Sequence, residues 1–160
     1  MLRIYGRRPL TRLEAALYAG FTAVLIAIFL ERVLAYMVFA ERMAMEATVN
    51  QVMSGANRRL AYDLLRGARH DSEAWKRRNP FELAGIAHAN FAGELDTAQV
   101  QGIGGGAWAF DRERGELIYR PRLRIGLQTS DPDGVLRFRG SLASGALGYT
   151  LVPATSYQWD

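Results

Sequence analysis

The sequence predicts an α+β protein in which one long N-terminal helix packs on a small antiparallel β-sheet. The segment from Leu10 to Arg66 contains no proline, and apolar side chains recur along its second half at three- and four-residue steps, which is helical spacing. From Trp108 onward, apolar side chains alternate with polar ones, which is the period of a β-strand. A sheet with one apolar face needs a cover, and this helix has the long apolar face that can provide it.

The first half of the predicted helix is expected to span a membrane. No charged residue lies between Ala15 and Leu30. At about 1.5 Å per residue this run reaches roughly 24 Å, a little short of the roughly 30 Å hydrocarbon core of a bilayer. Slight thinning of the bilayer, or flanking charged side chains that extend toward the interface, makes up the difference.

The charges around the apolar run predict which side of the membrane each part occupies. Arg3, Arg7, Arg8 and Arg12 precede the run, and positive charge resists translocation, so the N-terminus is expected to stay in the cytoplasm and the bulk of the chain to be exported. The predicted organisation is a basic leader at 1–9, a transmembrane or assembly helix at 10–40, and an exported domain at 41–160 with a helix at 41–67 and a sheet at about 107–152.

Two features of the apolar helix are candidate assembly elements. Small residues recur at every fourth position, which lets helix backbones approach closely; they are Ala15, Ala19, Ala23 and Ala27. The alternative is that alanine is simply a common, good helix former. Glu14 is the second feature, because an acid at the mouth of a membrane segment is costly unless a cation neutralises it. The alternative for Glu14 is a solvated glutamate beside Arg12.

The N-terminus resembles that of type IV pilin-like proteins, a class that includes the pseudopilins of type II secretion. The resemblance lies in the basic leader, the five residues from Leu10 to Glu14 (Leu-Thr-Arg-Leu-Glu), and the unbroken apolar helix after them. Further segments are similar to one pilin-like group, namely 41–49, 90–95, 108–111 and 115–120. The chain departs from the family pattern at Pro9, where the family has glycine, and at Arg12, an unusually early charge.

The resemblance implies a pilin-like fold and a specific maturation. In that family a prepilin peptidase removes the leader and methylates the new N-terminus, which here places the cut between Pro9 and Leu10. The family's acid pairs with the terminal amine of a neighbouring subunit, so Glu14 is expected to meet another subunit's Leu10. The implied partners are other pilin-like subunits and the inner-membrane assembly platform. The implied location is the inner membrane, with a periplasmic domain, or a periplasmic or surface filament.

Two functional hypotheses follow. The first is a structural subunit, a minor pilin or pseudopilin, of a type IV pilus or a type II secretion filament. The second is a periplasmic domain that does not assemble and is held by an uncleaved, single-pass signal anchor, or is released by cleavage after the small-residue segment at 38–40. The N-terminal residue of the mature protein distinguishes them, because it is Leu10 for a processed pilin, Met1 for an anchor and Glu41 for a released domain.

The charge distribution argues against a nucleic-acid-binding protein, although the sequence pI is about 9.8. Residues 41–160 hold 15 basic and 14 acidic side chains, and the other 5 basic and 2 acidic ones lie in the first 40 residues. The positive excess therefore reflects membrane topology. A local basic cluster is interpreted mainly as a solvated surface, and it contains Arg58, Arg59, Arg66, Arg69, Lys76, Arg77 and Arg78.

No enzyme, metal or cofactor is predicted. The chain has no cysteine, which excludes disulfides and thiolate zinc ligands. Its histidines, His70 and His88, lack a second ligand at a metal-like spacing, and Asp131 and Asp133 are explained by a turn. The glycine run at 102–106 lacks the lysine and hydroxyl residue of a phosphate-binding loop, so it is interpreted as a flexible connection.

The remaining elements are predicted from local pattern. The helical stripe contains Met45, Val49, Val52, Met53, Ala56, Leu60 and Leu64, with Gly67 as the C-cap. Asn79 and Pro80 begin a short helix over 81–89, and residues 90–106 are a connection. Strands are expected at 108–110, 117–119, 122–128, 136–138 and 149–152, with a tail beyond Pro153. One sheet face is expected to be apolar and the other, with Arg137 and Arg139, solvated.

Overall fold

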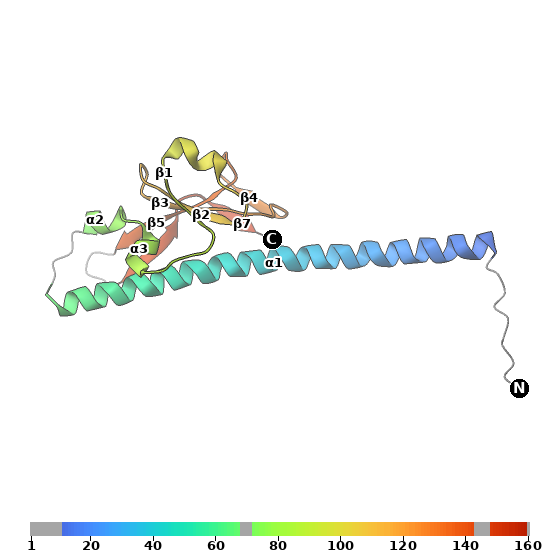
Figure 1. Ribbon diagram of the computed structural model, residues 1–160, viewed down its shortest axis with the longest axis horizontal. Helices are drawn as coiled ribbons and strands as arrows, with labels where there is room; N and C mark the ends of the chain where they lie inside the picture. The colour runs from blue at the N-terminus through green and yellow to red at the C-terminus, as the bar shows by residue number, and fades with distance from the viewer. Residues whose placement is uncertain (1–10, 68–71, 143–147, 160) are drawn as a thin grey trace, which may run out of the picture. The chain divides into compact units, whose positions relative to one another are not determined.

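A computed structural model of the chain describes residues 11–67, 72–142 and 148–159 (Figure 1). The chain divides into two compact units, residues 1–37 and residues 38–160, and the division falls within helix α1 (Arg12–Leu65). The leader at 1–9 and Leu10 lie outside the described residues.

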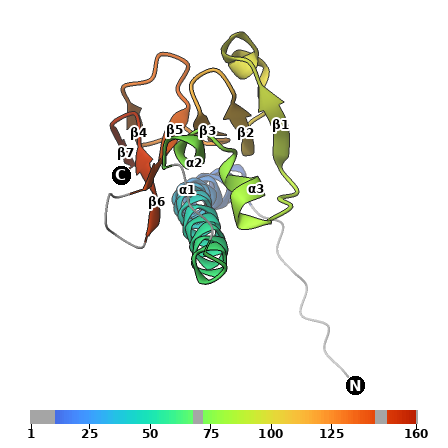
Figure 2. The same ribbon diagram turned by 90° about the vertical axis from the view of Figure 1, so that its left-hand side faces the viewer.

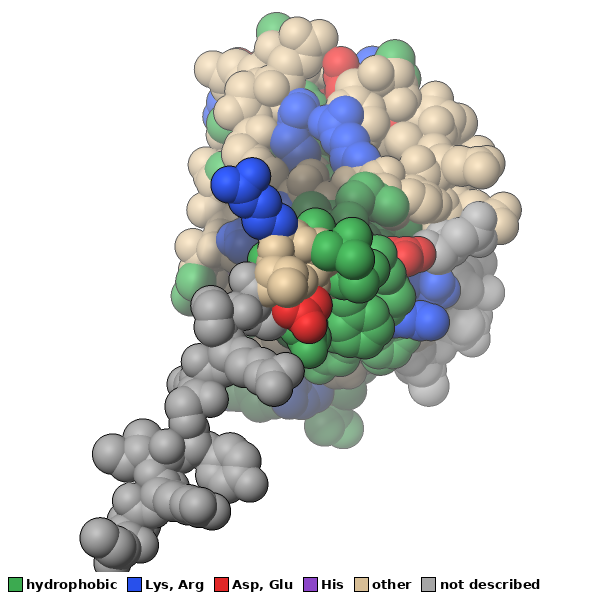
Figure 3. All heavy atoms as spheres, turned by 90° about the vertical axis from the view of Figure 1, so that its right-hand side faces the viewer, with side chains coloured by type: hydrophobic (Ala, Val, Ile, Leu, Met, Phe, Trp, Pro, Cys, Tyr) green, Lys and Arg blue, Asp and Glu red, His purple; other side chains and the backbone are tan. Residues whose placement is uncertain are grey.

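The described part of the first unit is helical, and its apolar side chains are exposed. Large hydrophobic residues from Leu13, which is 73% exposed, to Met37, which is 51% exposed, show this along the whole segment. Figure 3 shows hydrophobic side chains gathered over the surface of α1. The segment 12–37 spans roughly 39 Å at about 1.5 Å per residue, so it is long enough to cross a bilayer.

The second unit combines short helices with two sheets. Its elements after α1 are α2 (Ser72–Lys76), α3 (Pro80–Ala84), β1 (Phe91–Leu95), the 3-10 helix η1 (Thr97–Gly102), β2 (Ala107–Asp111), β3 (Glu116–Arg120), β4 (Leu127–Thr129), β5 (Leu136–Leu142), β6 (Tyr149–Pro153) and β7 (Tyr157–Trp159). The larger sheet has the order β1-β2-β3-β5-β6, and β4 pairs with β7 separately. The α+β class is therefore confirmed.

The larger sheet is mixed, so the prediction of an antiparallel sheet is wrong in one respect. Strand β1 runs parallel to β2, while the other three pairings are antiparallel. The local sequence pattern predicts only a connection over residues 90–106. A parallel neighbour that is reached through η1 leaves no hairpin signal in the sequence, which is why this strand was missed.

The main hydrophobic core lies between α1 and one face of the larger sheet (Figure 2). The predicted stripe supplies Met45, Val52, Ala56 and Leu60, all at most 4% exposed, whereas Leu64 near the helix end is 41% exposed. The sheet face opposite the stripe carries Trp108, Leu117, Tyr119, Leu136, Phe138, Tyr149 and Leu151. The expectation that the helix covers the sheet is confirmed.

The second face of the sheet is also buried at its centre, which corrects the prediction of a solvated face. Ala109 and Ile118 are both fully buried, and they pack with Val100 of η1 and with Ile103 and Val135. Arg137 lies on this face and is only 4% exposed, because its charge is neutralised by buried acids described below. The missed element η1 is what covers this face.

The strand predicted at 122–128 forms only at its end, where Leu127 and Gln128 belong to β4 (Leu127–Thr129). The backbone N–H groups of Arg122 and Leu123 donate to the Glu41 carboxylate on α1, so they are not available to a β-ladder. Gly126 then has a φ of 70°, which turns the chain before the short strand β4. The predicted tail beyond Pro153 instead contains β7, which pairs with β4, and the strand predicted at 149–152 is confirmed as β6.

Helix α3 is shorter than the predicted helix over 81–89, although its predicted start is confirmed. The Asn79 side chain accepts a hydrogen bond from the Phe81 N–H at 3.0 Å and caps the helix. Gly85, with a φ of 66°, ends it in the left-handed conformation. Gly55 of α1 lets α3 approach closely, because a Cβ atom at Gly55 would lie 2.7 Å from the Ala84 Cβ and 2.8 Å from its carbonyl oxygen.

We predict that Gly55→Ala destabilises the folded unit by roughly 1–3 kcal/mol, because it overpacks the contact between α1 and α3. This loss should exceed the gain of about 1 kcal/mol in helix propensity. Urea unfolding of the full chain in detergent, followed by tryptophan fluorescence, measures the change. The control is Ser54→Ala on the exposed side of α1, with an expected effect within about 0.5 kcal/mol. A Gly55→Ala variant more stable than Ser54→Ala would contradict the close approach.

Candidate functional site

The N-terminus of α1 is closed by a capping box between Thr11 and Glu14. The Thr11 N–H donates to Glu14 Oε2 at 2.8 Å, and the Glu14 N–H donates to Thr11 Oγ1 at 3.3 Å. The Thr11 hydroxyl also donates to Oε2, at 3.0 Å. This capping role of Glu14 is additional to its predicted role in assembly, and the pattern Thr-x-x-Glu before an apolar run is its signature. Glu14 therefore stabilises the start of its own helix.

The capping contacts leave part of the Glu14 carboxylate unused. Both hydrogen bonds that Glu14 accepts end on Oε2, and within the described residues Oε1 accepts none. The side chain is exposed, so the charge faces the surroundings of the helix. The other predicted partners in the pairing and the cut, Pro9 and Leu10, lie outside the described residues. The pairing of Glu14 with another subunit's amine stays a prediction.

The four alanines of the small-residue row lie on the exposed surface of α1. Ala15, Ala19, Ala23 and Ala27 follow one another at a spacing of four residues within a continuous helix, so they share one side of it. By length and composition α1 contains a segment that could cross a membrane. A close helix–helix contact along the row is thus geometrically open, and it stays a prediction.

The start of the folded unit is fixed by polar contacts from two adjacent residues of α1. Glu41 accepts hydrogen bonds from the Tyr119 hydroxyl at 2.9 Å and from the Leu123 N–H at 3.0 Å, in addition to the Arg122 N–H. Arg42 Nη1 donates to the Trp159 carbonyl oxygen at 2.6 Å. The contacts join the helix to β3, to the loop that follows it, and to β7. Burial and the neighbouring Glu41 carboxylate raise the pKa of Tyr119.

A side-chain amide closes the edge of the larger sheet. Asn57 of α1 donates from Nδ2 to the Tyr149 carbonyl oxygen at 2.9 Å and accepts from the Tyr149 N–H at 2.7 Å. This pair of bonds imitates one rung of a β-ladder on strand β6, the edge strand of the sheet. The Tyr149 hydroxyl is buried without a hydrogen-bond partner within the described chain, and burial raises the pKa of Tyr149.

A buried ion cluster holds the second face of the sheet. Arg137 Nε donates to Asp131 Oδ2 at 2.6 Å, and Arg137 Nη1 lies 3.5 Å from Asp111 and 3.6 Å from Glu116. The side chains of all four residues are at most 5% exposed. Burial by itself would lower the pKa of the Arg137 guanidinium, but the hydrogen bond and the charge of Asp131 raise it. The cluster is structural, since the three carboxylates surround one buried guanidinium that neutralises part of their charge.

The residues considered for metal binding or catalysis have structural partners. Asp131 and Asp133 form a turn, in which the Asp133 N–H donates to Asp131 Oδ1 at 2.9 Å, and Asp131 also binds Arg137. His88 Nδ1 accepts from the Asn90 N–H at 3.2 Å, whereas His70 lies outside the described residues. Within the described ranges no three His, Cys, Asp or Glu side chains are grouped so that they could hold a metal ion.

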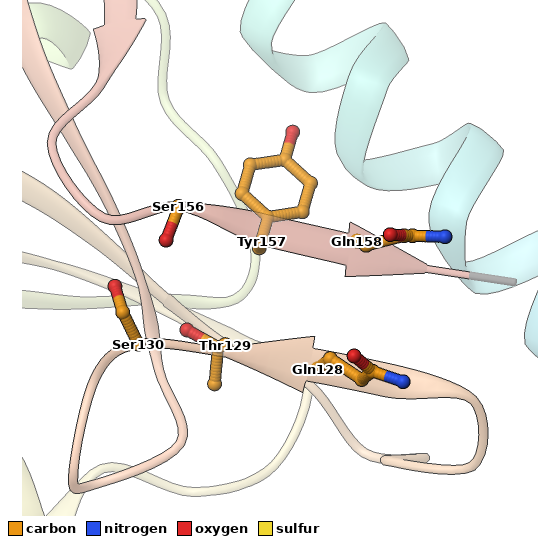
Figure 4. A pocket seen from close by; sticks show the side chains of 6 residues that line it. All are labelled: Gln128, Thr129, Ser130, Ser156, Tyr157 and Gln158. Carbon is orange, nitrogen blue, oxygen red and sulfur yellow. The ribbon is translucent and has the colours of Figure 1, made fainter.

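A pocket of about 400 Å³ lies over strands β4 and β7 and is lined by uncharged side chains (Figure 4). Its lining residues are Gln128, Thr129, Ser130, Ser156, Tyr157 and Gln158. Burial raises the pKa of Tyr157, which disfavours its use as a base near neutral pH. The hydroxyls and amides that line the pocket offer hydrogen bonds but no charged acid or base.

No protein-family model matches the chain, and comparison with curated proteins and with solved structures finds no match either. The N-terminal resemblance and the contacts above are therefore the basis for a functional proposal.

We predict that Arg137→Gln destabilises the folded unit by roughly 3–5 kcal/mol, because it leaves buried carboxylates without their cation. The control is Arg112→Gln, which breaks the exposed pair with Asp96 and should cost at most about 1 kcal/mol. Urea unfolding in detergent measures both. Equal losses in the two variants would mean that the Arg137 cluster is not buried.

The two buried tyrosines should differ in their effect on stability. We predict that Tyr149→Phe is neutral or stabilising at pH 7, because it removes a buried hydroxyl without a partner. Tyr119→Phe should cost about 1–3 kcal/mol, because it removes a donor from Glu41. Unfolding free energies in urea measure both.

The same variants test the dependence of stability on pH. The folded pKa of each tyrosine is raised above the value of about 10 in an unfolded chain, so stability is kept below pH 10 and lost as the pH rises above it. Tyr149→Phe should reduce this alkaline loss, as measured by unfolding between pH 8 and pH 11. An unchanged alkaline slope in Tyr149→Phe would rule out a raised pKa at that position.

Proposed function

We propose that this chain is a pilin-like structural subunit, a minor pilin or pseudopilin of a type IV pilus or type II secretion filament. The observation that carries the proposal is the exposed apolar first part of α1, with Glu14 at its start. The proposed role is assembly, with no catalytic step. The packing of α1 on a small sheet is consistent with the pilin-like fold that the N-terminal resemblance implies.

The exposed apolar surface of α1 favours a function in which this surface is covered by something outside the chain. Burial of one large aliphatic or aromatic side chain is worth about 1.5–3 kcal/mol. Fourteen large hydrophobic residues are exposed between Leu13 and Met37, and a soluble monomer rarely leaves so extended an apolar surface in water. Lipid before assembly, and the helices of other subunits after it, would provide the cover.

Glu14 is proposed to select the register of the next subunit. Its carboxylate keeps one oxygen free of the capping contacts, and its charge lies beside an apolar helix surface where an unpaired anion is unfavourable. A positively charged terminal amine of another subunit, exposed by a cut between Pro9 and Leu10, would neutralise it. The alanine row from Ala15 to Ala27 would then let the two helices approach closely.

This proposal sets the partners and the location. The partners are other pilin-like subunits, the inner-membrane assembly platform and a prepilin peptidase. Before assembly the chain would be a single-pass inner-membrane protein with a cytoplasmic N-terminus and a periplasmic domain. One membrane-length apolar helix also fits the second candidate, a domain on an uncleaved signal anchor. N-terminal sequencing decides between a methylated Leu10 and an intact Met1.

We predict that Glu14→Gln abolishes incorporation into filaments while the folded unit keeps its stability. Glutamine can serve in the capping box in place of glutamate, so this variant removes the charge and retains the cap. Incorporation is measured by the amount of the chain in sheared or purified filaments, and folding by tryptophan fluorescence.

The matched control is Thr11→Ala, which weakens the cap by about 1 kcal/mol and keeps the Glu14 charge. It should still enter filaments. If Glu14→Gln assembles normally, charge pairing is not the role of Glu14. If Thr11→Ala fails to assemble while Glu14→Gln assembles, the capping box is required for assembly and the charge of Glu14 is not.

A further inference from the structure

The loop 121–126, here called the arginine loop, is held where α1 enters the folded unit. Glu41 is the first residue after the uncharged segment 33–40, which follows Glu31 and Arg32, and it binds the backbone of Arg122 and Leu123. The next residue of the helix, Arg42, binds the end of β7. Strand β4, which follows the arginine loop, and strand β7 lie together at one end of the folded unit (Figure 1). The loop is therefore close in space to the segment that connects to the membrane helix.

The side chains of Arg122 and Arg124, the two exposed arginines of the loop, each pack against a glycine. A Cβ atom at Gly106 would overlap the Arg122 side chain, and Arg122 Nε donates to the Gly105 carbonyl oxygen at 3.3 Å. A Cβ atom at Gly134 would lie 2.7 Å from Arg124 Nη1, and Arg124 Nη2 donates to the Asp133 carbonyl oxygen at 3.3 Å. Gly105 and Gly106, which belong to the predicted flexible glycine run, thus pack against the Arg122 side chain.

Arg122 and Arg124 are exposed, and their guanidinium groups keep donors that bind no described residue. Within the described chain neither Arg122 nor Arg124 forms an ion pair, and each makes a single side-chain hydrogen bond to a carbonyl oxygen. The nearest acids are engaged elsewhere, because Glu41 binds backbone N–H groups and Asp133 lies 4.0 Å from Arg137. An arginine that is already positioned loses little freedom when it binds a phosphate.

An apolar side chain and a pocket accompany the arginines. Ile125 is 52% exposed, directly after Arg124. Beside Arg122 lies a pocket of about 270 Å³, which Asn90, Phe91 and Gly105 also line. Cations next to an exposed aliphatic residue are the composition of segments that bind at the surface of an anionic bilayer.

We propose that the arginine loop docks on the phosphate groups of anionic phospholipids in the bilayer that α1 spans. Arg122 and Arg124 bind phosphate oxygens, and Ile125 enters the interface between headgroups and acyl chains. The loop thereby holds the folded unit at the membrane surface before assembly. This proposal rests on the membrane anchoring proposed above, and it adds a lipid-binding surface that anchoring alone does not require.

The test uses the full chain in nanodiscs with a fluorescent label at Ile125→Cys, which is unique because the chain has no cysteine. Discs of phosphatidylcholine are compared with discs that also contain phosphatidylglycerol. We expect a blue-shifted emission and quenching by brominated lipid in the anionic discs. Two arginines near an anionic surface should raise the ratio of docked to free loop roughly 30-fold. About 1 M salt, where the Debye length is about 3 Å, should reverse the effect.

The controls distinguish an effect of Arg122 and Arg124 themselves from an effect of the net charge of the folded unit. Arg122→Gln with Arg124→Gln should abolish the difference between the discs, whereas Arg112→Gln with Arg114→Gln, an equal loss of charge in the turn after β2, should keep it. A label at Val152→Cys, an exposed position on β6, should report no difference. Identical emission of the Ile125 label in both discs, or a difference that survives loss of both arginines, overturns the proposal. A chain that inserts into neutral discs but shows no lipid dependence overturns only this proposal, whereas a chain that fails to insert overturns the anchoring as well.

Discussion

The apolar side chains of α1 between Leu13 and Met37 are exposed in the folded chain, and this exposure constrains every other part of the molecule. The hydrophobic effect requires that such a surface leave water, and the described residues of the first unit provide nothing to cover it. The cover proposed here is a bilayer before assembly and the helices of other subunits after it. The folded unit, in contrast, buries apolar side chains in a core on each face of the larger sheet.

Glu41 and Arg42 are the first residues of α1 after Ala40 that form polar contacts with the sheets and loops of the folded unit. The uncharged segment 33–40 ends at Ala40, and the next two residues bind β3, the arginine loop and β7. Farther along α1, Asn57 binds the edge strand β6 through two hydrogen bonds. These polar contacts fix the helix against the sheet at two points, while the buried stripe between them supplies the apolar packing. The same helix can thus serve as a membrane segment in one part and as a core element in the other.

Much of the fold follows from periodicity, because periodicity reports local structure. The helical stripe, the cap at Asn79 and the hairpin of β2 and β3 were all predicted from spacing and turn residues. The errors arose where contacts between distant residues decide the outcome. Residues 122–128 alternate like a strand, but the Glu41 carboxylate takes two of their backbone donors.

The burial of charged residues likewise cannot be predicted from the local sequence pattern. Alternation in β5 assigns Arg137 to the face opposite the core, and it does lie there, but η1 and the loop at 131–134 bury that face. For the candidate site, the capping box of Glu14 could have been predicted from Thr11, whereas the packing of Arg122 and Arg124 against glycines depends on folding.

The most direct test of the central claim is the state of the full-length chain in water without detergent. Sedimentation velocity, combined with mass spectrometry that confirms intact residues 1–40, measures it. The exposed apolar surface of α1 predicts that the chain aggregates or forms large assemblies and becomes dispersed only with detergent or lipid. A freely soluble, monodisperse monomer with those residues intact would contradict the claim that this helix needs a cover from outside the chain.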